Sequence, residues 1–155
     1  MQIRRFIPSD AAPVSALIAR TLRISNAADY APGEIEDLVA RMQPDFILQR
    51  AAWTHFYVAE ENDTIIGCGA IGPYWDREDE SSLFTIFVLP EWQGRGVGRR
   101  IVETLERDEF AMRAKRIEIP ASVTGLAFYR KLGYDFKDGC AEIDEEHLYR
   151  LEKWL

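Results

Sequence analysis

The stretch Gln93-Gly94-Arg95-Gly96-Val97-Gly98-Arg99 lies between an apolar run and a segment with helical spacing. The run before it, residues 83–89, is rich in β-branched and aromatic residues, as a buried strand is, and Pro90 ends that strand because it has no backbone N–H. After it, residues 101–110 carry apolar side chains at helical spacing. A strand, a glycine loop and a helix in this order direct free N–H groups and the positive end of a helix dipole at an anion. The stretch therefore predicts a site for a phosphate-bearing ligand.

Two common phosphate-binding loops do not match this stretch. A dinucleotide-binding loop needs the pattern G-x-G-x-x-G, and the position of its last glycine holds arginine or isoleucine here. A nucleoside triphosphate loop ends in G-K-[S/T], and no lysine follows these glycines. The pattern that remains is Q-x-x-G-x-G, formed by Gln93, Gly96 and Gly98.

A second motif follows at residues 121–134, Ala-Ser-Val-Thr-Gly-Leu-Ala-Phe-Tyr-Arg-Lys-Leu-Gly-Tyr, after the strand-like run 116–119. The first pattern resembles the pyrophosphate loop of the GCN5-related N-acetyltransferase (GNAT) family, which binds the diphosphate of acetyl-coenzyme A. The second resembles that family's fifth strand and the helix after it, whose pattern ends in F-Y-x-x-L-G-[F/Y]. Gly133 is well placed after a helix end, where a left-handed conformation costs glycine nothing. The two motifs come in the family's order, and the resemblance extends over residues 45–137.

The other segments predict a mixed α/β (α+β) fold, in which a mixed, mostly antiparallel sheet carries helices on both faces, as in the GNAT fold. We expect one N-acetyltransferase domain over residues 1–155. The expected elements are a strand at 2–7, a helix through Val14, Leu17, Ile18 and Leu22, a polar break at 26–33, a helix at 34–42, a hairpin of 55–59 with 64–71, an acidic loop at 75–82, and two last strands at 141–143 and 147–151.

Composition excludes several classes of protein. The chain of 155 residues is 47% hydrophobic and 29% charged, which is ordinary for a globular domain. No apolar run approaches the ~20 residues of a membrane span, and the N-terminus lacks the apolar core of a signal peptide, so a cytoplasmic location is expected. A net charge of −7 argues against nucleic acid. Two cysteines form no disulfide framework, and Cys68 is expected to be a small buried residue.

The resemblance implies acetyl-CoA as cosubstrate and no metal. In the family the pantetheine arm lies along the fourth strand, where a bulge leaves main-chain groups free. The implied coenzyme-binding residues are Ile86, Phe87 and Val88 through their backbone; Gln93, Gly94, Arg95, Gly96, Val97, Gly98 and Arg99 at the diphosphate, with Arg100 as a further cation; and Thr124, which stands near the position where many members carry an asparagine.

Transfer of an acetyl group to an amine needs an acid for the leaving thiolate and a base for the amine. The resemblance places Tyr129 near the coenzyme sulfur, and we expect it to be the proton donor. Some members carry a glutamate early on the fourth strand, but the equivalent position here is Ser82. Glu118 on the fifth strand is the candidate base, with Glu80, Asp79 or a chain of waters as alternatives. His55 and His147 have no partner at metal or triad spacing, so structural roles are expected.

The acceptor is less well defined. The acidic excess suits a cationic amine, and equally a merely solvated surface. Candidate lining residues are the segment 23–30 with Trp53, Tyr74 and Trp75. We expect direct transfer in a ternary complex to a primary amine, with a small molecule slightly favoured over a protein. A non-catalytic acyl-CoA-binding module of the same fold is the alternative, and homodimerisation stays open.

Overall fold

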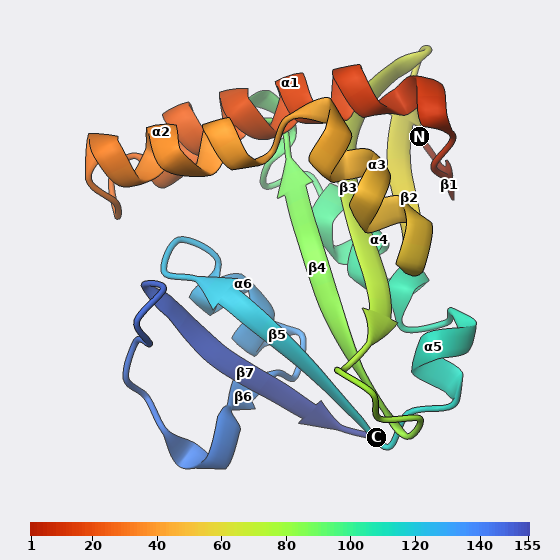
Figure 1. The fold of residues 1–155 in the computed structure, drawn as a ribbon, viewed down its shortest axis with the longest axis vertical. Coiled ribbons are helices and arrows are strands. Elements are labelled where there is room, and N and C mark those ends of the chain that lie inside the picture. Colours follow the sequence, from red (N-terminus) through yellow and green to blue (C-terminus); the bar gives the residue numbers. More distant parts are fainter.

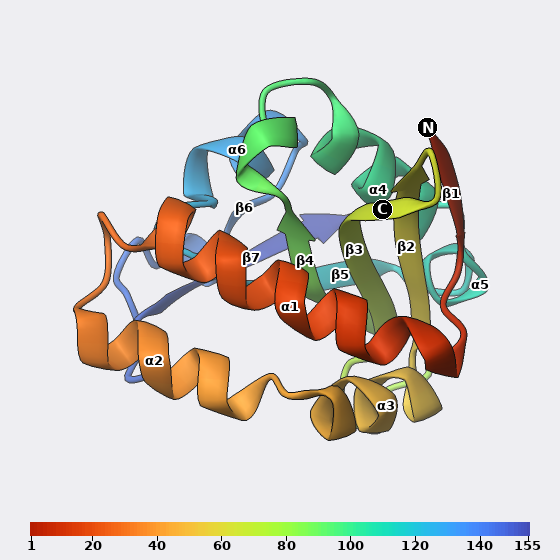
Figure 2. The ribbon, with the colours of Figure 1, turned by 90° about the horizontal axis from the view of Figure 1, so that it is seen from above.

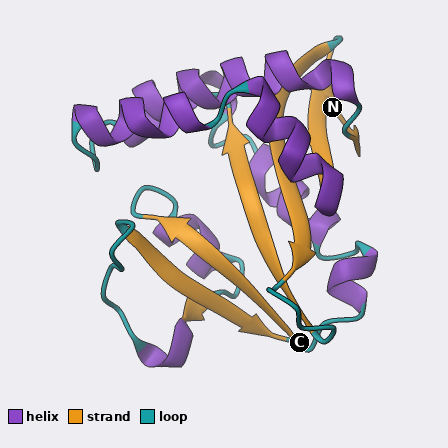
Figure 3. Ribbon diagram, viewed as in Figure 1, coloured by secondary structure: helices purple, strands orange, loops and turns teal.

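A computed structural model describes the whole chain, residues 1–155, and shows a seven-stranded sheet with helices on both of its faces (Figures 1 and 3). The strands are β1 (Gln2–Arg5), β2 (His55–Glu61), β3 (Thr64–Pro73), β4 (Glu80–Val88), β5 (Arg116–Ser122), β6 (Asp135–Phe136) and β7 (Leu148–Trp154). The α-helices are α1 (Ala11–Thr21), α2 (Pro32–Arg41), α3 (Pro44–Trp53), α4 (Val97–Leu105), α5 (Glu109–Met112) and α6 (Leu126–Lys131), and a π-helical segment η2 (Leu22–Asn26) extends α1. None of these helices combines the length and the apolar character that crossing a bilayer requires.

The helices form two layers, one on each side of the strands (Figure 2). Helices α1, α2 and α3 cover one face, where Val14 and Ile18 of α1 belong to the same buried core as Phe56 and Val58 of β2. Helices α4, α5 and α6 cover the other face. In α4 the apolar residues Val97, Ile101, Val102 and Leu105 recur at helical spacing, and all four are buried in the second core.

The sheet has the order β1-β2-β3-β4-β5-β7-β6, and only β4 and β5 run parallel. These two strands pair over three residues each, Glu80–Ser82 with Arg116–Glu118, and then diverge, so that β4 and β5 form a V (Figure 1). Beyond Glu118, β5 has a hydrogen-bonded neighbour only in β7. Pro120 is tolerated inside β5 for this reason, since proline, which has no backbone N–H, fits a strand where one edge is unpaired.

A β-bulge interrupts β4 opposite β3. Phe84 pairs with Ala70 and Phe87 with Cys68, so Thr85 and Ile86 together oppose a single residue of β3. Thr85 has a φ of 56°, which is a strained conformation for a β-branched residue. The extra residue changes the alternation of side chains: Phe84 and Phe87 pack on the α1–α3 side, whereas Ile86 packs on the α4–α6 side.

The predicted fold class and hairpin are confirmed, whereas four local predictions are wrong and one helix was not predicted. Residues 75–82 are not all loop, because β4 begins at Glu80 and pairs with β5. Helix α1 continues as η2 into the predicted break. Helix α3 was not predicted. The helix expected through residue 110 ends at Leu105, and Asp108 caps the separate α5 by accepting from Phe110 N. Residues 141–143 are exposed and form no strand, since the partner of β7 at the sheet edge is β6.

Candidate active site

The glycine loop before α4 presents unused backbone donors. Gly94 and Gly96 adopt φ values of 72° and 83°, which residues with a side chain rarely adopt. The N–H groups of Gly94, Arg95 and Gly96 donate no hydrogen bond within the chain. The first N–H groups of α4 follow directly, and the start of a helix leaves such groups without intrahelical acceptors. Together they form a cradle suited to an anion.

Gly98 serves packing as well. A Cβ atom at this position would lie 3.0 Å from Cζ of Phe128 and 3.6 Å from Cγ2 of Val88. The absence of a side chain therefore lets the first turn of α4 approach α6 and the end of β4 closely. This contact sets the loop at the open end of the V formed by β4 and β5.

The arginines of the loop differ in their surroundings. The guanidinium of Arg95 lies 4.3 Å from the ring centroid of Trp92, and Arg99 forms an ion pair of 3.7 Å with Glu103. Arg100 has no carboxylate within ion-pair distance, and its carbonyl accepts from Thr104. All three side chains belong to exposed residues, so each can reorient toward an anion at the cradle.

The expected pantetheine positions have distinct backbone environments. Leu89 N donates to Ile66 O, so by strand alternation the backbone groups of Val88 and Ile86 point away from β3, toward the side from which β5 has diverged. Phe87, opposite Cys68, instead directs its backbone groups toward β3. The Val88 carbonyl already accepts from Thr21 Oγ1 at 3.2 Å and from Gln93 Nε2 at 3.0 Å. Val88 therefore has its N–H, rather than its carbonyl, free for a ligand.

Tyr129 of α6 is buried, and its hydroxyl makes no hydrogen bond within the chain. Burial raises the pKa of the Tyr129 phenol well above its usual range, and the nearby Cys68 thiol adds to this shift. Gly125 accommodates the ring, because a Cβ there would lie 2.9 Å from Cε2 of Tyr129. Cys68 itself donates to the carbonyl of Thr85 at 3.3 Å, so the phenol lies in the neighbourhood of the bulge. The Tyr129 hydroxyl is therefore a protonated hydrogen-bond donor that has no acceptor within the chain.

Glu118 belongs to a buried ionic cluster at the base of the V. Its Oε1 accepts from Arg116 at 3.0 Å and pairs with Lys137 at 2.8 Å, while no contact involves Oε2. Arg116 also pairs with Glu80 at 3.2 Å and with Glu152 at 3.0 Å. The guanidinium of Arg116 is almost fully buried, and the three carboxylates around it compensate for its desolvation.

Glu80 and Asp79, the alternative candidates for the base, lie farther toward the closed end of the V. Ser82 pairs with Glu118 in the last rung of the β4–β5 ladder, and Glu80 pairs with Arg116 in the first. Asp79 precedes β4, is 45% exposed in its side chain and forms ion pairs with Arg77 and Lys115. Among these acidic groups, Glu118 is the one whose backbone borders the point of divergence.

The segment after η2 ties the α1–α2 layer to the ends of β5 and β7. The Tyr30 hydroxyl accepts from Val123 N and donates to His147 O, both at 2.9 Å. Thr124 Oγ1 donates to Asp29 at 2.7 Å. Two expected acceptor-lining residues, Asp29 and Tyr30, thus make contacts that join separate segments.

The remaining candidates have mixed surroundings. Trp53 is partly exposed at the end of α3, Trp75 is 82% exposed in the turn before β4, and Tyr74 lies under Arg116 and Lys137. His147 Nδ1 lies 2.9 Å from Glu34. Cys68 is fully buried, as predicted.

Arg50 was not among the residues predicted from the sequence, and its Nη1 lies 3.4 Å from Thr85 Oγ1 at the bulge. One signal for its helix was present, since Pro44 suits the first position of a helix. Nothing in the sequence alone brings Arg50 to Thr85.

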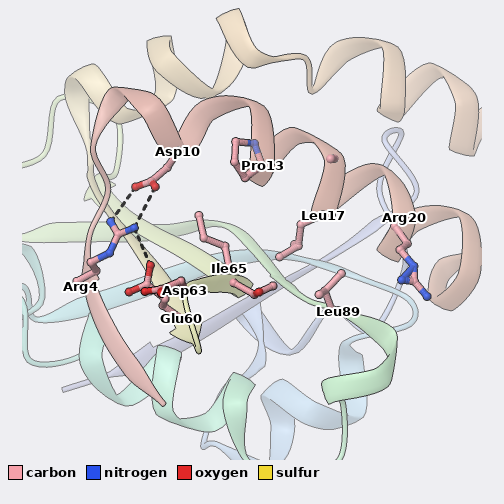
Figure 4. Close-up of a pocket in the computed structure, with 11 residues that line it drawn as sticks. Arg4, Asp10, Pro13, Leu17, Arg20, Glu60, Asp63, Ile65 and Leu89 are labelled. Carbon is pink, nitrogen blue, oxygen red and sulfur yellow. Dashed lines mark hydrogen bonds and ion pairs between the residues drawn. The ribbon is translucent and has the colours of Figure 1, made fainter.

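A surface pocket lies away from the V, between α1 and the β2–β3 hairpin (Figure 4). Arg4 bridges Asp10, at 2.9 and 3.0 Å, and Glu60, at 3.2 Å. Burial alone would raise the pKa of Asp10, but the hydrogen bonds from Arg4 and Ile7 N outweigh it and lower that pKa. The charges of Arg4, Asp10 and Glu60 are thus paired with one another, and Arg4 fastens β1 to the start of α1.

The family follows from a comparison with known domains. A domain described as "Acetyltransferase (GNAT) domain" matches residues 52–135, more than half of the chain, including the glycine loop and the Tyr129 helix. The chain belongs to the GNAT acetyltransferase family. The resemblance noted in the sequence is thereby confirmed.

Individual relatives agree with this assignment. An IAA acetyltransferase of Azospirillum brasilense is 34% identical over 83 residues, which are 51% of this chain and 53% of that protein, so the chain matches about half the length of this relative. The crystal structure of PaiA N-acetyltransferase from Thermoplasma acidophilum in complex with coenzyme A superposes with a TM-score of 0.84 at 16% identity, covering 99% of this GNAT chain and 98% of that one. A GCN5-related N-acetyltransferase structure from Rhodopseudomonas palustris has a TM-score of 0.80 at 22% identity, covering 99% and 95%. At these identities the two structures support the fold.

Proposed function

We propose that residues 1–155 form an acetyl-CoA-dependent N-acetyltransferase domain that transfers acetyl directly to the primary amine of a small molecule in a ternary complex. The observation that carries this proposal is the position of the unused N–H groups of Gly94, Arg95 and Gly96 at the open end of the V between β4 and β5. An extended ligand with a diphosphate at one end fits this combination of an anion cradle and two diverging strand edges.

Backbone groups would make most of the contacts with acetyl-CoA. The N–H groups of residues 94–99 would hold the diphosphate, and Arg95 and Arg99 would add positive charge. Ile86 and Val88 would pair with the pantetheine arm, whereas Phe87 contributes by keeping β4 on β3. Gln93 would act by holding the loop to β4, and Thr124 by fixing the β5–α6 turn to Asp29.

Acetyl-CoA supplies an acyl group activated as a thioester. A bond forms between the amine nitrogen and the acyl carbon, the carbon–sulfur bond breaks, and the nitrogen loses a proton while the sulfur gains one. Tyr129 would give its phenolic proton to the departing sulfur, since the phenol is protonated and has no other partner. Glu118 would take the amine proton through water at Oε2, with Oε1 held by Arg116 and Lys137.

The contacts of the η2–α2 segment favour a small acceptor. Tyr30 and Asp29 join this segment to Val123, Thr124 and His147 on the opposite side of the V. Such bridges restrict access from that side, and a protein substrate would have to displace them. The net charge of −7 also suits a cationic amine.

A non-catalytic acyl-CoA-binding module is the alternative, favoured by Ser82, which cannot act as a base. Thermal melting with and without acetyl-CoA tests both functions, and we expect the ligand to raise the melting temperature. No shift with any acyl-CoA would exclude both. A thiol-release screen against primary amines then separates them: turnover supports the enzyme, and its absence across a broad amine panel supports the module.

A further inference from the structure

Arg50 is a half-buried cation without an anionic partner. Its guanidinium carbon lies 4.6 Å from the ring centroid of Phe84, 5.0 Å from that of Phe46 and 5.4 Å from that of Trp53. Burial lowers the pKa of Arg50, and no neighbouring charge contributes to that shift. The only polar side-chain contact is the long one to Thr85 Oγ1.

Arg116, the buried arginine at the β4–β5 junction, shows how a buried cation is usually compensated. Arg116 is surrounded by Glu80, Glu118 and Glu152. Removing a cation from water is costly unless an opposite charge compensates, and aromatic faces return only part of that cost. The three rings hold the planar Arg50 guanidinium in a fixed orientation but leave its charge uncompensated. Such a group is prepared for an anion that arrives from outside the chain.

The position of Arg50 indicates which anion this is. Thr85 is the bulged residue of β4, and Ile86 follows it at the start of the strand edge assigned above to the pantetheine arm. Helix α3 lies on the sheet face opposite α4 and α6 (Figure 2), so Arg50 reaches the bulge from the side opposite Tyr129's helix. The coenzyme's own phosphates belong to the cradle at residues 94–99, at the other end of this strand segment. The anion at Arg50 therefore belongs to the acceptor.

We propose that Arg50 binds a carboxylate of the acceptor, so that the substrate class is small molecules carrying both a primary amine and a carboxylate, such as amino acids. This rests on the proposed N-acetyltransferase function. A guanidinium binds a carboxylate through two parallel N–H···O bonds, which fix the orientation of the bound molecule. With the carboxylate at Arg50, an amine a few bonds away lies next to the bulge.

The test compares amino acids with their C-terminal amides, which keep the ammonium group and the side chain but lose the negative charge. With acetyl-CoA and a thiol-release readout, wild type is expected to use the best free acid with a kcat/KM about 10- to 100-fold above that of its amide. Arg50→Met is expected to lower this ratio to near one by raising KM for the acid. Arg50→Lys, which keeps the charge but loses the planar fork, is expected to fall between them. Arg107 is an exposed residue in the turn after α4, so Arg107→Met is the matched control for lost charge and should keep the wild-type ratio.

Melting temperature with and without acetyl-CoA shows whether each variant is folded and binds the donor. Equal use of acid and amide by wild type, or equal loss of both in Arg50→Met, would overturn the carboxylate assignment while leaving the acetyltransferase proposal intact. No donor binding, or no turnover of any amine, would overturn both. Because the acid-to-amide ratio of wild type needs no variant, the proposal stays testable even where Arg50→Met fails to fold.

Discussion

The side-chain amide of Gln93 donates to the carbonyl of Val88 at 3.0 Å, closing the turn that carries the chain from β4 into the glycine loop. A second hydrogen bond of 2.9 Å reaches Ser25 Oγ in η2. One side chain thus links the end of β4, the loop and the helix layer on the other face. The glutamine of the Q-x-x-G-x-G pattern positions the loop within the chain itself, and the glycines provide the free donors.

Gly96 offers a test of the anion cradle. Gly96→Ala and Gly96→Asp both place a side chain at a φ of 83°, which costs about 1–2 kcal/mol, with no steric neighbour within 4 Å. Only the aspartate adds a negative charge against a diphosphate. We expect both variants to melt a few degrees lower, and acetyl-CoA to raise the melting temperature of Gly96→Ala but not of Gly96→Asp. A wild-type ligand shift in the aspartate variant would contradict the cradle.

Tyr129→Phe tests the proton donor. The lost hydroxyl has no hydrogen-bond partner in the chain, so melting temperature and KM for acetyl-CoA should stay at wild-type values. We expect kcat to fall about 100-fold, the scale of general acid catalysis. The matched control is Tyr134→Phe, whose hydroxyl donates to Glu106 at 3.0 Å; it should lose about 1 kcal/mol of stability and keep kcat. Wild-type kcat in Tyr129→Phe would exclude the acid role.

Glu118→Gln tests the proposed base. The change breaks the contacts with Arg116 and Lys137, and we expect a loss of about 3 kcal/mol, because one partner of a buried ion pair disappears. We also expect kcat to fall about 100-fold, the scale of general base catalysis. Glu152→Gln breaks a contact of 3.0 Å with the same Arg116 but lies on β7, so it should cost similar stability and keep kcat. A wild-type kcat in Glu118→Gln would assign the amine proton to another group.

Asp108 links stability to pH. It accepts from Tyr57 at 2.6 Å and lies 2.7 Å from His55 Nδ1. Burial alone would raise the pKa of Asp108, but the hydrogen bonds from Tyr57, Phe110 N and His55 outweigh it, and the folded-state pKa lies below the usual value. A lowered pKa means stability that is present above the unfolded-state value, near 3.9, and lost as pH falls through the folded-state value.

Asp108→Asn keeps the helix cap but removes this charge. We expect a loss of about 1–3 kcal/mol at pH 7, measured by urea unfolding, with the difference from wild type shrinking below about pH 4. Asp63→Asn is the control, since Asp63 sits in the β2–β3 turn at a φ of 63° that asparagine also tolerates, and it should unfold like wild type. A difference that persists at pH 3 would show that the charge is not responsible.

The two cysteines should react at very different rates. Cys68 is fully buried and burial raises the pKa of its thiol to about 12, whereas Cys140 is exposed. Iodoacetamide should add one group to the native protein and two after denaturation, as measured by mass spectrometry. Iodoacetamide should add no group to the native Cys140→Ser variant. This variant is therefore also the preferred background for thiol-release assays. Native labelling at both positions would show that β3 opens.

The glycine loop and the Tyr129 helix could be predicted because their signals are local. Glycines mark the loop, and Phe128, Tyr129 and Gly133 occur at fixed spacing within one helix. Helix α3 was missed because it buries only Ile47 fully, so its apolar periodicity is weak. The bulge was not located either, since no residue type in the sequence Thr-Ile-Phe requires a positive φ at Thr85.

The other features could not be predicted because they depend on contacts between residues that are distant in sequence. Lys137 meets Glu118 and Arg50 meets Thr85 only once the sheet has formed. The strand-like run was predicted over residues 116–119, whereas β5 continues through Pro120 to Ser122, where the diverged β4 no longer pairs with it. These are tertiary effects, and a local pattern contains no information about them.

Under the proposed function, the V between β4 and β5 recognises its two substrates through two kinds of chemical group. Main-chain amides are present whatever residue occupies a position, so a donor bound through the edge of β4 at Ile86 and Val88 tolerates exchange of these residues for other apolar ones. An acceptor bound through Arg50 depends on a single side chain. Under the proposed function, mutational drift in this chain would alter which amine is acetylated long before it altered the acyl donor.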